Sequence, residues 1–276
     1  MAAATEDVAA PAAAAARRRR APLPRRGWRD RVPAVLAAVG ALLLWQAVIM
    51  IFDVPGFIAP SPLEVVETLV TKADLFWRNL IPTFFEAVAG FVCGNGVAIL
   101  LAVWFVHSRT AERSLYPIMV FINTIPILAL APILVLLFGN GYTPKVIIAA
   151  LICFFPTLVN MVRGLKAVNP ATLDLMRILS ASPTEILWRV RLPCSLPFLF
   201  AALKIASTTC VIGAVVGEWV GSNEGLGAVI LQAMYDYRTP TLYATVTLAA
   251  GMAVAFFALF SHLERRLIRW KAADVH

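Results

Sequence analysis

The sequence predicts an all-α, polytopic membrane protein with six transmembrane helices. Of its 276 residues, 60% are hydrophobic and only 14% are charged, and the mean hydropathy of +0.80 is too high for an ordinary soluble domain. A helix needs roughly 20 mostly apolar residues to cross a bilayer, and six continuous stretches qualify, whereas barrel strands would alternate in shorter segments. The expected crossings are residues 33–52, 83–106, 118–138, 145–162, 196–217 and 242–262.

Positive charges predict the orientation of these crossings. Basic residues concentrate in cytoplasmic segments of membrane proteins, and one side of the predicted map carries most of the 24 Lys and Arg residues. The opposite side carries only Lys72, Arg78, Lys145 and Arg238. Both termini are therefore expected in the cytoplasm. The net charge of +8 could also indicate nucleic-acid binding, but anionic lipid headgroups are the simpler partner for charges at membrane boundaries.

Several segments outside the crossings have a recognisable composition. Residues 1–32 are rich in Ala, Arg and Pro without an apolar run, which predicts a disordered basic cytoplasmic arm. The transmembrane domain is expected over residues 33–270, followed by a cytoplasmic tail at residues 271–276. On the outer side, residues 63–70 after a Pro-rich turn predict a short helix, and residues 228–235 predict another that is too short to cross.

Short links are expected between the middle helices. Residues 107–117 would join the second and third crossings on the cytoplasmic side. Gly139-Asn140-Gly141 would let the chain reverse tightly on the outer side, because glycine adopts turn conformations freely. Gly90 and Gly94 lie four residues apart on the second crossing, a spacing typical of close helix contacts.

A polar segment that contains arginines lies between the fourth and fifth crossings. Asn169-Pro170 and Ser182-Pro183 are helix-start signals, so we expect two short helices that meet at a bend. Apolar side chains cluster beside its charges, namely Leu175, Met176, Ile178 and Leu179. An exposed apolar patch outside the membrane normally marks an interaction site. The alternative is a solvated loop whose charges only reflect membrane topology.

The chain has no motif of an enzyme. It contains no GxxxxGK[ST] string for binding nucleotide phosphates, and the nearest candidate, which ends at Lys145, has the wrong spacing and lies on the predicted outer side. His107, His262 and His276 are accompanied by neither a carboxylate pair nor an HExxH motif. We therefore expect that the chain catalyses no reaction and binds no cofactor itself.

The polar segment resembles the cytoplasmic loop of permease subunits of ABC importers. That loop has the form E-A-A, three residues, G, nine residues, I-x-L-P. Here Asp174-Leu175-Met176 is followed in the same register by Ser180 and by Val190-Arg191-Leu192-Pro193. Ser180 replaces the glycine of the loop. If that position requires a positive φ, serine is strained there by about 1 kcal/mol.

Other strings extend the resemblance over roughly residues 33–270. They are Phe57-Ile58-Ala59-Pro60-Ser61-Pro62, Gly90-Phe91, Pro126 with Ala131-Pro132 and Phe138-Gly139, Phe155-Pro156 with Gly164-Leu165, and Gly217-Glu218 with Gly225-Leu226-Gly227. In these the chain is similar to the nitrate, sulfonate and taurine permeases, a family of binding-protein-dependent transport inner membrane components. Relatives that carry pyrimidine-type vitamin precursors or riboflavin share the pattern, and Gly217-Glu218-Trp219-Val220-Gly221 is somewhat more similar to theirs.

The resemblance implies a type I ABC importer permease fold and a place in the bacterial inner membrane. The chain would form the translocation path for a small solute, either sulfonate-, nitrate- or taurine-like or pyrimidine- or riboflavin-like. It would act as a homodimer with two ATPase subunits that use ATP and with an external binding protein. Residues 164–193 would be the coupling segment that docks on the ATPase, through Asp174, Leu175, Met176, Arg177, Leu179, Ser180, Val190, Leu192 and Pro193.

Polar residues within the crossings are candidates for the solute pathway. They are Asn123, Thr124, Asn160, Thr208 and Glu218. On the fifth crossing, Lys204, Thr208 and Glu218 share one helical face. Polar groups in hydrocarbon need partners, so hydrogen bonds between helices are an equal alternative to solute contact. Lys204 could instead reach the cytoplasmic interface, Glu218 could anchor the outer helix end, and Glu86 is expected to be interfacial or paired.

Two other classes of function compete with the importer. A secondary transporter or channel would work without nucleotide, but such carriers often have about twice as many crossings and use carboxylates inside the membrane. Only Glu86 and Glu218 lie near membrane depth here, both close to the outer side. A scaffold or membrane enzyme would leave the pattern of residues 174–193 unexplained.

Overall fold

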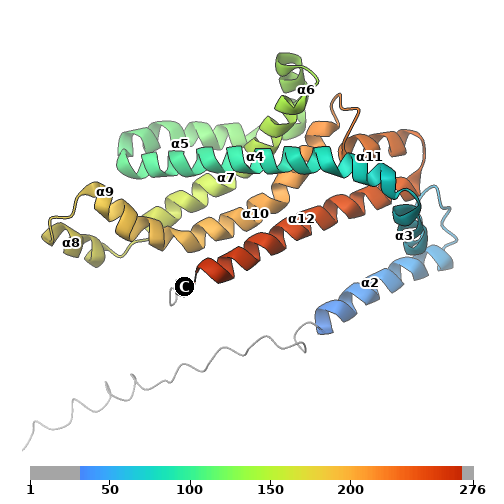
Figure 1. Ribbon diagram of the computed structural model, residues 1–276, viewed down its shortest axis with the longest axis horizontal. Helices are drawn as coiled ribbons and strands as arrows, with labels where there is room; N and C mark the ends of the chain where they lie inside the picture. Colours follow the sequence, from blue (N-terminus) through green and yellow to red (C-terminus); the bar gives the residue numbers. More distant parts are fainter. Residues whose placement is uncertain (1–31, 269–276) are drawn as a thin grey trace, which may run out of the picture. The chain divides into compact units, whose positions relative to one another are not determined.

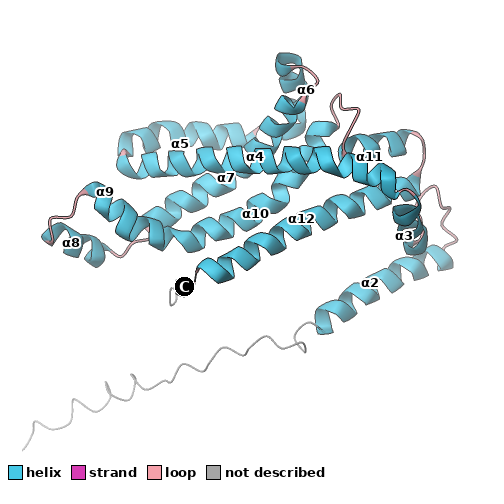
Figure 2. Ribbon diagram, in the orientation of Figure 1, coloured by secondary structure: helices cyan, strands magenta, loops and turns pink. Residues whose placement is uncertain are grey.

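The computed structural model describes residues 32–268, which form helices joined by short turns (Figure 1, Figure 2). The chain divides into two units, residues 1–52 and residues 53–276. The first unit contains helix α2 (Val32–Ile51), which carries no charged residue. The described residues contain no strand, which confirms the predicted all-α class. Residues 1–31 of the predicted arm and the predicted tail lie outside the described residues.

The second unit contains the remaining helices. They are α3 (Pro62–Thr71), α4 (Ala73–His107), α5 (Arg109–Thr124), α6 (Ile127–Phe138), α7 (Tyr142–Lys166), α8 (Pro170–Ile178), α9 (Pro183–Ile186), α10 (Leu192–Glu218), α11 (Leu226–Tyr235) and α12 (Thr239–Leu267), with a π-helical turn, Leu187–Arg191, before α10. α7 packs against both α4 and α10, and α12 packs against α10. Figure 1 shows α8 and α9 at one end of these long helices and α3 and α11 at the other.

Four helical stretches in the described part of the chain are long and apolar enough to cross a membrane. They are α4, α7, the continuous stretch Pro183–Glu218, which includes α10, and α12. Each contains a predicted crossing and extends beyond it; α4, for example, begins at Ala73 rather than at residue 83. α2 coincides with the first predicted crossing, but it counts among the shorter apolar helices.

The third predicted crossing, residues 118–138, is not one continuous helix. Its two parts, α5 and α6, meet at a bend of 97°. Ile125 lies between them with an extended backbone, φ −71° and ψ 126°, because Pro126 disfavours the helical conformation in the residue before it. The predicted link at residues 107–117 is also wrong. Ser108 alone separates α4 from α5, and its hydroxyl caps the first turn of α5, so the helix resumes at once.

Small residues allow α7 to lie close to α4 and α10. A Cβ atom at Gly94 would lie 2.9 Å from the Cα of Ala150, and one at Gly213 would lie 2.7 Å from the Cα of Ala149. These distances leave no room for a side chain, so only glycine permits this helix spacing. The close contact predicted from the spacing of Gly90 and Gly94 is confirmed, since both positions face α7.

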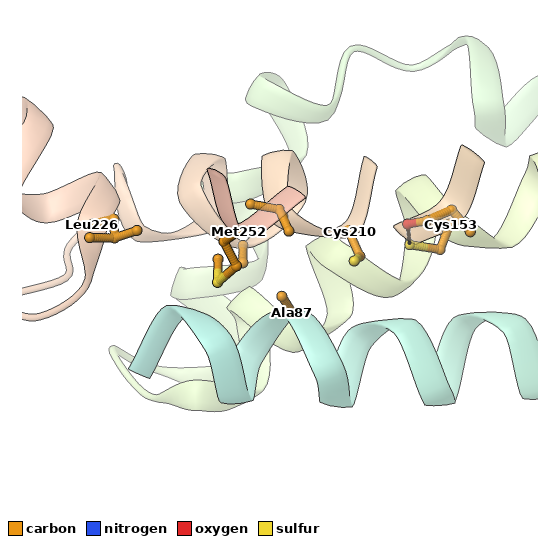
Figure 3. Packing of buried hydrophobic residues seen from close by; sticks show 8 residues of the cluster. Ala87, Cys153, Cys210, Leu226 and Met252 are labelled. Carbon is orange, nitrogen blue, oxygen red and sulfur yellow. Dashed lines mark hydrogen bonds between the residues drawn. The ribbon is translucent and has the colours of Figure 1, made fainter. Parts of the chain in front are cut away.

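An apolar cluster joins five helices of the second unit (Figure 3). Ala87 of α4, Cys153 of α7, Cys210 of α10, Leu226 of α11 and Met252 of α12 are buried in it. Leu226 is the first residue of α11. Its burial therefore fixes where this short helix begins relative to the long ones.

Candidate functional site

Two short helices, α8 and α9, form the middle of the predicted coupling segment. α8 begins where the Asn169 side chain accepts a hydrogen bond from the Ala171 N–H at 2.9 Å. α9 begins with a capping box between Ser182 and Glu185. The predicted pair of helix starts is confirmed. Because the caps satisfy backbone groups that helix ends leave unpaired, these helices keep defined ends despite their length.

The turn after α8 holds Ser180 in a left-handed conformation. Its φ is 54°. The Ser180 N–H donates to the Arg177 carbonyl at 2.9 Å, and the Ala181 N–H donates to the Met176 carbonyl at 3.0 Å. These are the two bonds of a Schellman motif, which usually has glycine at this position because a Cβ atom crowds the backbone there. The positive φ on which the predicted strain depends is therefore present.

α8 presents an apolar face that the described part of the chain leaves uncovered. Leu175, Ile178 and Leu179 are 55%, 79% and 67% exposed, and we call these three residues the α8 patch. Met176, which the sequence grouped with them, is half-buried. Trp188, on the π-helical turn, is 67% exposed and was not predicted. The only signal for it in the sequence was that a large aromatic residue occurs within a polar segment.

The charged side chains of the coupling segment pair locally. Arg177 bonds Asp174 at 2.9 Å within α8, and Arg189 lies 3.8 Å from Glu185. All four side chains are largely exposed, and such exposed pairs add little stability, typically about 0–1 kcal/mol. These charges can therefore turn toward another molecule at small cost.

The last residues of the predicted coupling motif lie at the junction with α10. Val190, Leu192 and Pro193 are half-buried, and Leu192 packs against the apolar core. Beside them the Arg191 guanidinium donates to the Leu165 carbonyl at the end of α7, at 3.0 Å. This junction attaches α8 and α9 to two of the long helices at once.

The predicted solute-pathway residues do not gather at one place. Asn123 and Thr124 are exposed at the end of α5, where Asn123 lines a small cavity beside the α5–α6 bend. Asn160 donates to the Pro156 carbonyl of its own helix at 2.8 Å. Thr208 is half-buried and lines an apolar cavity between α10 and α12.

Glu218, the fifth of these residues, is fully buried at the end of α10. Its Oε1 accepts a hydrogen bond from the Thr83 hydroxyl at 2.6 Å, and its Oε2 accepts one from the Gly227 N–H at 2.6 Å. In this structure the carboxyl group is bound within the protein and does not line an open path.

Side chains from α4 complete the same network. The Gly225 N–H donates to the Asn79 Oδ1 at 2.9 Å, and the Leu226 N–H donates to the Thr83 Oγ1 at 2.8 Å. Together with Glu218, these groups cap α11 from two neighbouring helices. Gly225 has a φ of 105°, and a Cβ atom there would collide with the Glu218 carboxyl group. Sequence reasoning missed Asn79 and Thr83, whose spacing of four residues on α4 was their only signal.

Two ion pairs join the long helices. Glu86 on α4 is fully buried, and its Oε1 accepts a hydrogen bond from the Lys145 Nζ on α7 at 2.8 Å. The paired alternative for Glu86 is therefore confirmed. Lys204 on α10 bonds Glu264 on α12 at 2.8 Å, an arrangement that the sequence did not indicate. Among the described residues, no group of His, Cys, Asp and Glu side chains could hold a metal ion.

Comparison with known proteins identifies the family. The profile of the family described as "Binding-protein-dependent transport system inner membrane component" matches residues 94–269. The chain belongs to this family. Over 234 residues, 84% of its length, this permease is 36% identical to a probable ABC transporter permease protein of Haemophilus influenzae, of which the match covers 96%.

Two further relatives have named solutes. The permease is 33% identical to the riboflavin transport system permease protein RibX of Chloroflexus aurantiacus, over 84% of this chain and 87% of that protein. It is also 33% identical to the formylaminopyrimidine transport permease protein ThiX of Halalkalibacterium halodurans, over 83% of this chain and 92% of that protein.

Solved structures share the fold of the permease. A chain of the inward-facing MetNI methionine ABC transporter aligns with a TM-score of 0.60 at 22% identity, covering 74% of this chain and 99% of that one. A chain of a bacterial ABC transporter involved in the import of alginate aligns with a TM-score of 0.60 at 16% identity, covering 88% of this chain and 99% of that one. The protein is thus a permease subunit of an ABC importer in the inner membrane, a transport component and not an enzyme. Family membership decides against the secondary transporter, the channel and the scaffold.

Proposed function

We propose that this permease crosses the inner membrane six times, with both termini in the cytoplasm. The four long helical stretches, the broken pair α5–α6 and α2 supply the six crossings. The excess of Lys and Arg around α8 and α9 supports a cytoplasmic position for the coupling segment. α3 and α11 then lie on the outer side, where an external binding protein would deliver the solute.

The transport complex contains two copies of this permease, two ATPase subunits and the external binding protein. The permease binds no cofactor, and ATP is hydrolysed by its partner. The description of the family as binding-protein-dependent supports the outer partner. The observation that carries the proposed ATPase partner on the cytoplasmic side is the α8 patch. Its three large apolar side chains are exposed on a capped helix outside the apolar spans.

In docking on the ATPase, α8 makes the contact and the junction with α10 transmits the movement. Leu175 and Leu179 enter an apolar groove of the ATPase with Met176 behind them, while Asp174 and Arg177 set the orientation by charge. Ser180 fixes the turn that follows. Val190, Leu192 and Pro193 carry the movement into α10, because α9, the π-helical turn and α10 follow one another without a break.

Single substitutions in the coupling segment test this docking. We expect Leu175→Asp and Leu179→Asp to abolish solute-stimulated ATP hydrolysis in the reconstituted complex, because each places a carboxylate in an apolar contact. Thr184→Asp is the matched control. Thr184 is also exposed in the same segment, and a carboxylate in the first turn of α9 is tolerated. Unchanged stimulation in both leucine variants, with the permease still in the membrane, would contradict the docking.

The solute is most consistent with a small nitrogen heterocycle of the flavin or pyrimidine class. Relatives at 33% identity are named for riboflavin and formylaminopyrimidine, while those named for aliphatic sulfonates are 27% identical or less. Along the proposed path, Asn123 and Thr124 at the α5–α6 bend are exposed to a solute, and Asn160 and Thr208 are half-buried. Glu218 would contact a solute only if its present hydrogen bonds opened.

Solute identity is tested on the external binding protein that works with this permease. Titration with riboflavin, formylaminopyrimidine, an aliphatic sulfonate and nitrate is expected to show tight binding of a heterocycle only. Selective binding of the sulfonate or nitrate would overturn the proposed class. It would leave the role of the coupling segment untouched.

A further inference from the structure

Two carboxyl groups meet inside the protein at the end of the helix bundle where α11 begins. Glu86 and Glu218 are both fully buried, and their side chains lie within hydrogen-bonding reach of each other. They come from α4 and α10, which are separated in the sequence by helices α5 to α9. Two carboxylates cannot share such a contact without a hydrogen atom between them, since both would only accept.

Three of the four carboxyl oxygens have a hydrogen-bond donor. Glu86 Oε1 accepts from the Lys145 Nζ, Glu218 Oε1 accepts from the Thr83 hydroxyl, and Glu218 Oε2 accepts from the Gly227 N–H. Glu86 Oε2 is buried and has no partner among the described residues. A buried polar atom without a hydrogen bond is rare and needs an explanation.

The charges of the site do not balance either. Lys145 is its one cation among the described side chains, and it lies 5.4 Å above the Tyr142 ring. α11 contributes only backbone groups, and Glu224 lines the polar cavity next to Lys145. One ammonium with two ionised carboxylates would leave an uncompensated negative charge in the interior. Such a charge is costly, and in carboxyl pairs it is removed by protonation.

We propose that Glu86 and Glu218 bind one proton between them, in a hydrogen bond from Glu86 Oε2 to the Glu218 carboxyl group. One proton supplies the missing hydrogen, satisfies the unpartnered oxygen and makes the site neutral. It belongs to the pair and not to either residue, because interacting carboxyl groups titrate together. The inference concerns this chain alone and does not depend on its solute or its partners.

The proton site is connected to solvent and to α11. The Lys145 side chain is 11% exposed and lines the same polar cavity as Asn140 and Ser222, which gives protons a route from the surface. Glu218 also caps α11 through Gly227. Occupancy of the site therefore stabilises the position of α11, the short helix that the proposed topology places on the outer side.

Infrared spectroscopy of the purified full-length permease tests the proposal. At neutral pH we expect a protonated carboxyl C=O band that shifts on transfer to D2O. Glu86→Gln and Glu218→Gln should each remove it, because the glutamine amide supplies the hydrogen and Lys145 still balances the remaining carboxylate. Glu264→Gln is the matched control and should keep the band, since Glu264 forms a one-to-one pair with Lys204.

A further variant, with an effect of the opposite sign, tests the proposal even if the glutamate variants do not fold. Lys145→Gln removes the only cation, so both carboxyl groups should then be protonated and the band should grow. Absence of the band in the wild-type protein would overturn the proposal, with a water molecule then satisfying Glu86 Oε2. A band that persists in Glu86→Gln and Glu218→Gln, or stays unchanged in Lys145→Gln, would overturn it as well.

Discussion

At the scale of single residues, Glu218 connects more of the structure than any motif indicated. As the last residue of α10 it bonds Thr83 of α4 and the first turn of α11, and it lies against Glu86. The glycines at 225 and 227 follow from it, because the backbone of α11 passes so close to the carboxyl group that a side chain would not fit. The string Gly225-Leu226-Gly227 is thus part of a hydrogen-bonded cap and not simply a loop.

Charge balance at this site predicts strong non-additivity. Glu86→Gln and Glu218→Gln each leave Lys145 with one carboxylate, so each should change stability only slightly. The double variant leaves the Lys145 ammonium, which is only 11% exposed, without a counter-charge, and this costs up to about 3–5 kcal/mol. Thermal unfolding in detergent should therefore show a coupling between the two substitutions well beyond additivity. A double variant no less stable than the sum of the single ones would contradict the charge assignment.

Backbone strain at Ser180 predicts that replacing this residue can increase the stability of the turn after α8. Ser180→Gly should stabilise the turn after α8 by about 1 kcal/mol, because glycine adopts a φ of 54° without a Cβ clash. Slower hydrogen exchange of the α8 amides would report the gain. Ser182→Gly is the control, since Ser182 has a φ of −68° and its replacement removes the cap of α9 without relieving strain. Equal protection in Ser180→Gly and the wild type would refute the strain.

At the scale of helices, local signals were reliable where a cap or a turn decides the structure. The starts of α8 and α9 follow from Asn169-Pro170 and Ser182-Pro183, and both are found in the structure. The break between α5 and α6 was missed although Pro126 was visible. Pro132 and Pro156 lie inside helices that continue, so proline alone does not distinguish a tolerated residue from a break. Neighbouring helices decide whether the freed backbone groups are satisfied.

The α5–α6 bend can be tested through Pro126. Pro126→Ala removes the restriction on Ile125, so the two helices should tend to join and straighten. Spin labels at Ser114→Cys in α5 and Leu136→Cys in α6 should then move apart, and solute uptake should fall. Pro132→Ala, in the interior of α6, is the matched control and should leave the distance between the labels unchanged. An unchanged distance in Pro126→Ala would mean that packing and not the proline sets the bend.

At the scale of the whole molecule, the sequence predicted the class of protein and the two short helices α8 and α9 far better than the buried site. Hydropathy, charge and the spacing from Asp174 to Pro193 are properties of short, continuous stretches of sequence. The contact between Glu218 and Thr83 joins residues 135 positions apart, and no periodicity in either helix indicates it. Glu218 was accordingly assigned to a helix end or a solute path, and its partners on α4 and α11 were not foreseen.

The proposed topology makes a prediction that concerns the molecule as a whole. Thr184 in α9 and Asn223 before α11 are both exposed, and Figure 1 shows α9 and α11 at opposite ends of the long helices. In a permease whose exposed cysteines, Cys93 and Cys194, are replaced by serine, Asn223→Cys should react with a membrane-impermeant thiol reagent added to intact spheroplasts.

Thr184→Cys should react with the same reagent only after the membrane is opened, because the proposed topology, which rests on the excess of basic residues, puts α9 in the cytoplasm. The comparison needs no knowledge of the solute, and both cysteines report on one chain. Labelling of Thr184→Cys in intact spheroplasts, with Asn223→Cys protected, would reverse the orientation. It would then exclude the α8 patch as a docking site for a cytoplasmic ATPase, since an ATPase could not reach it.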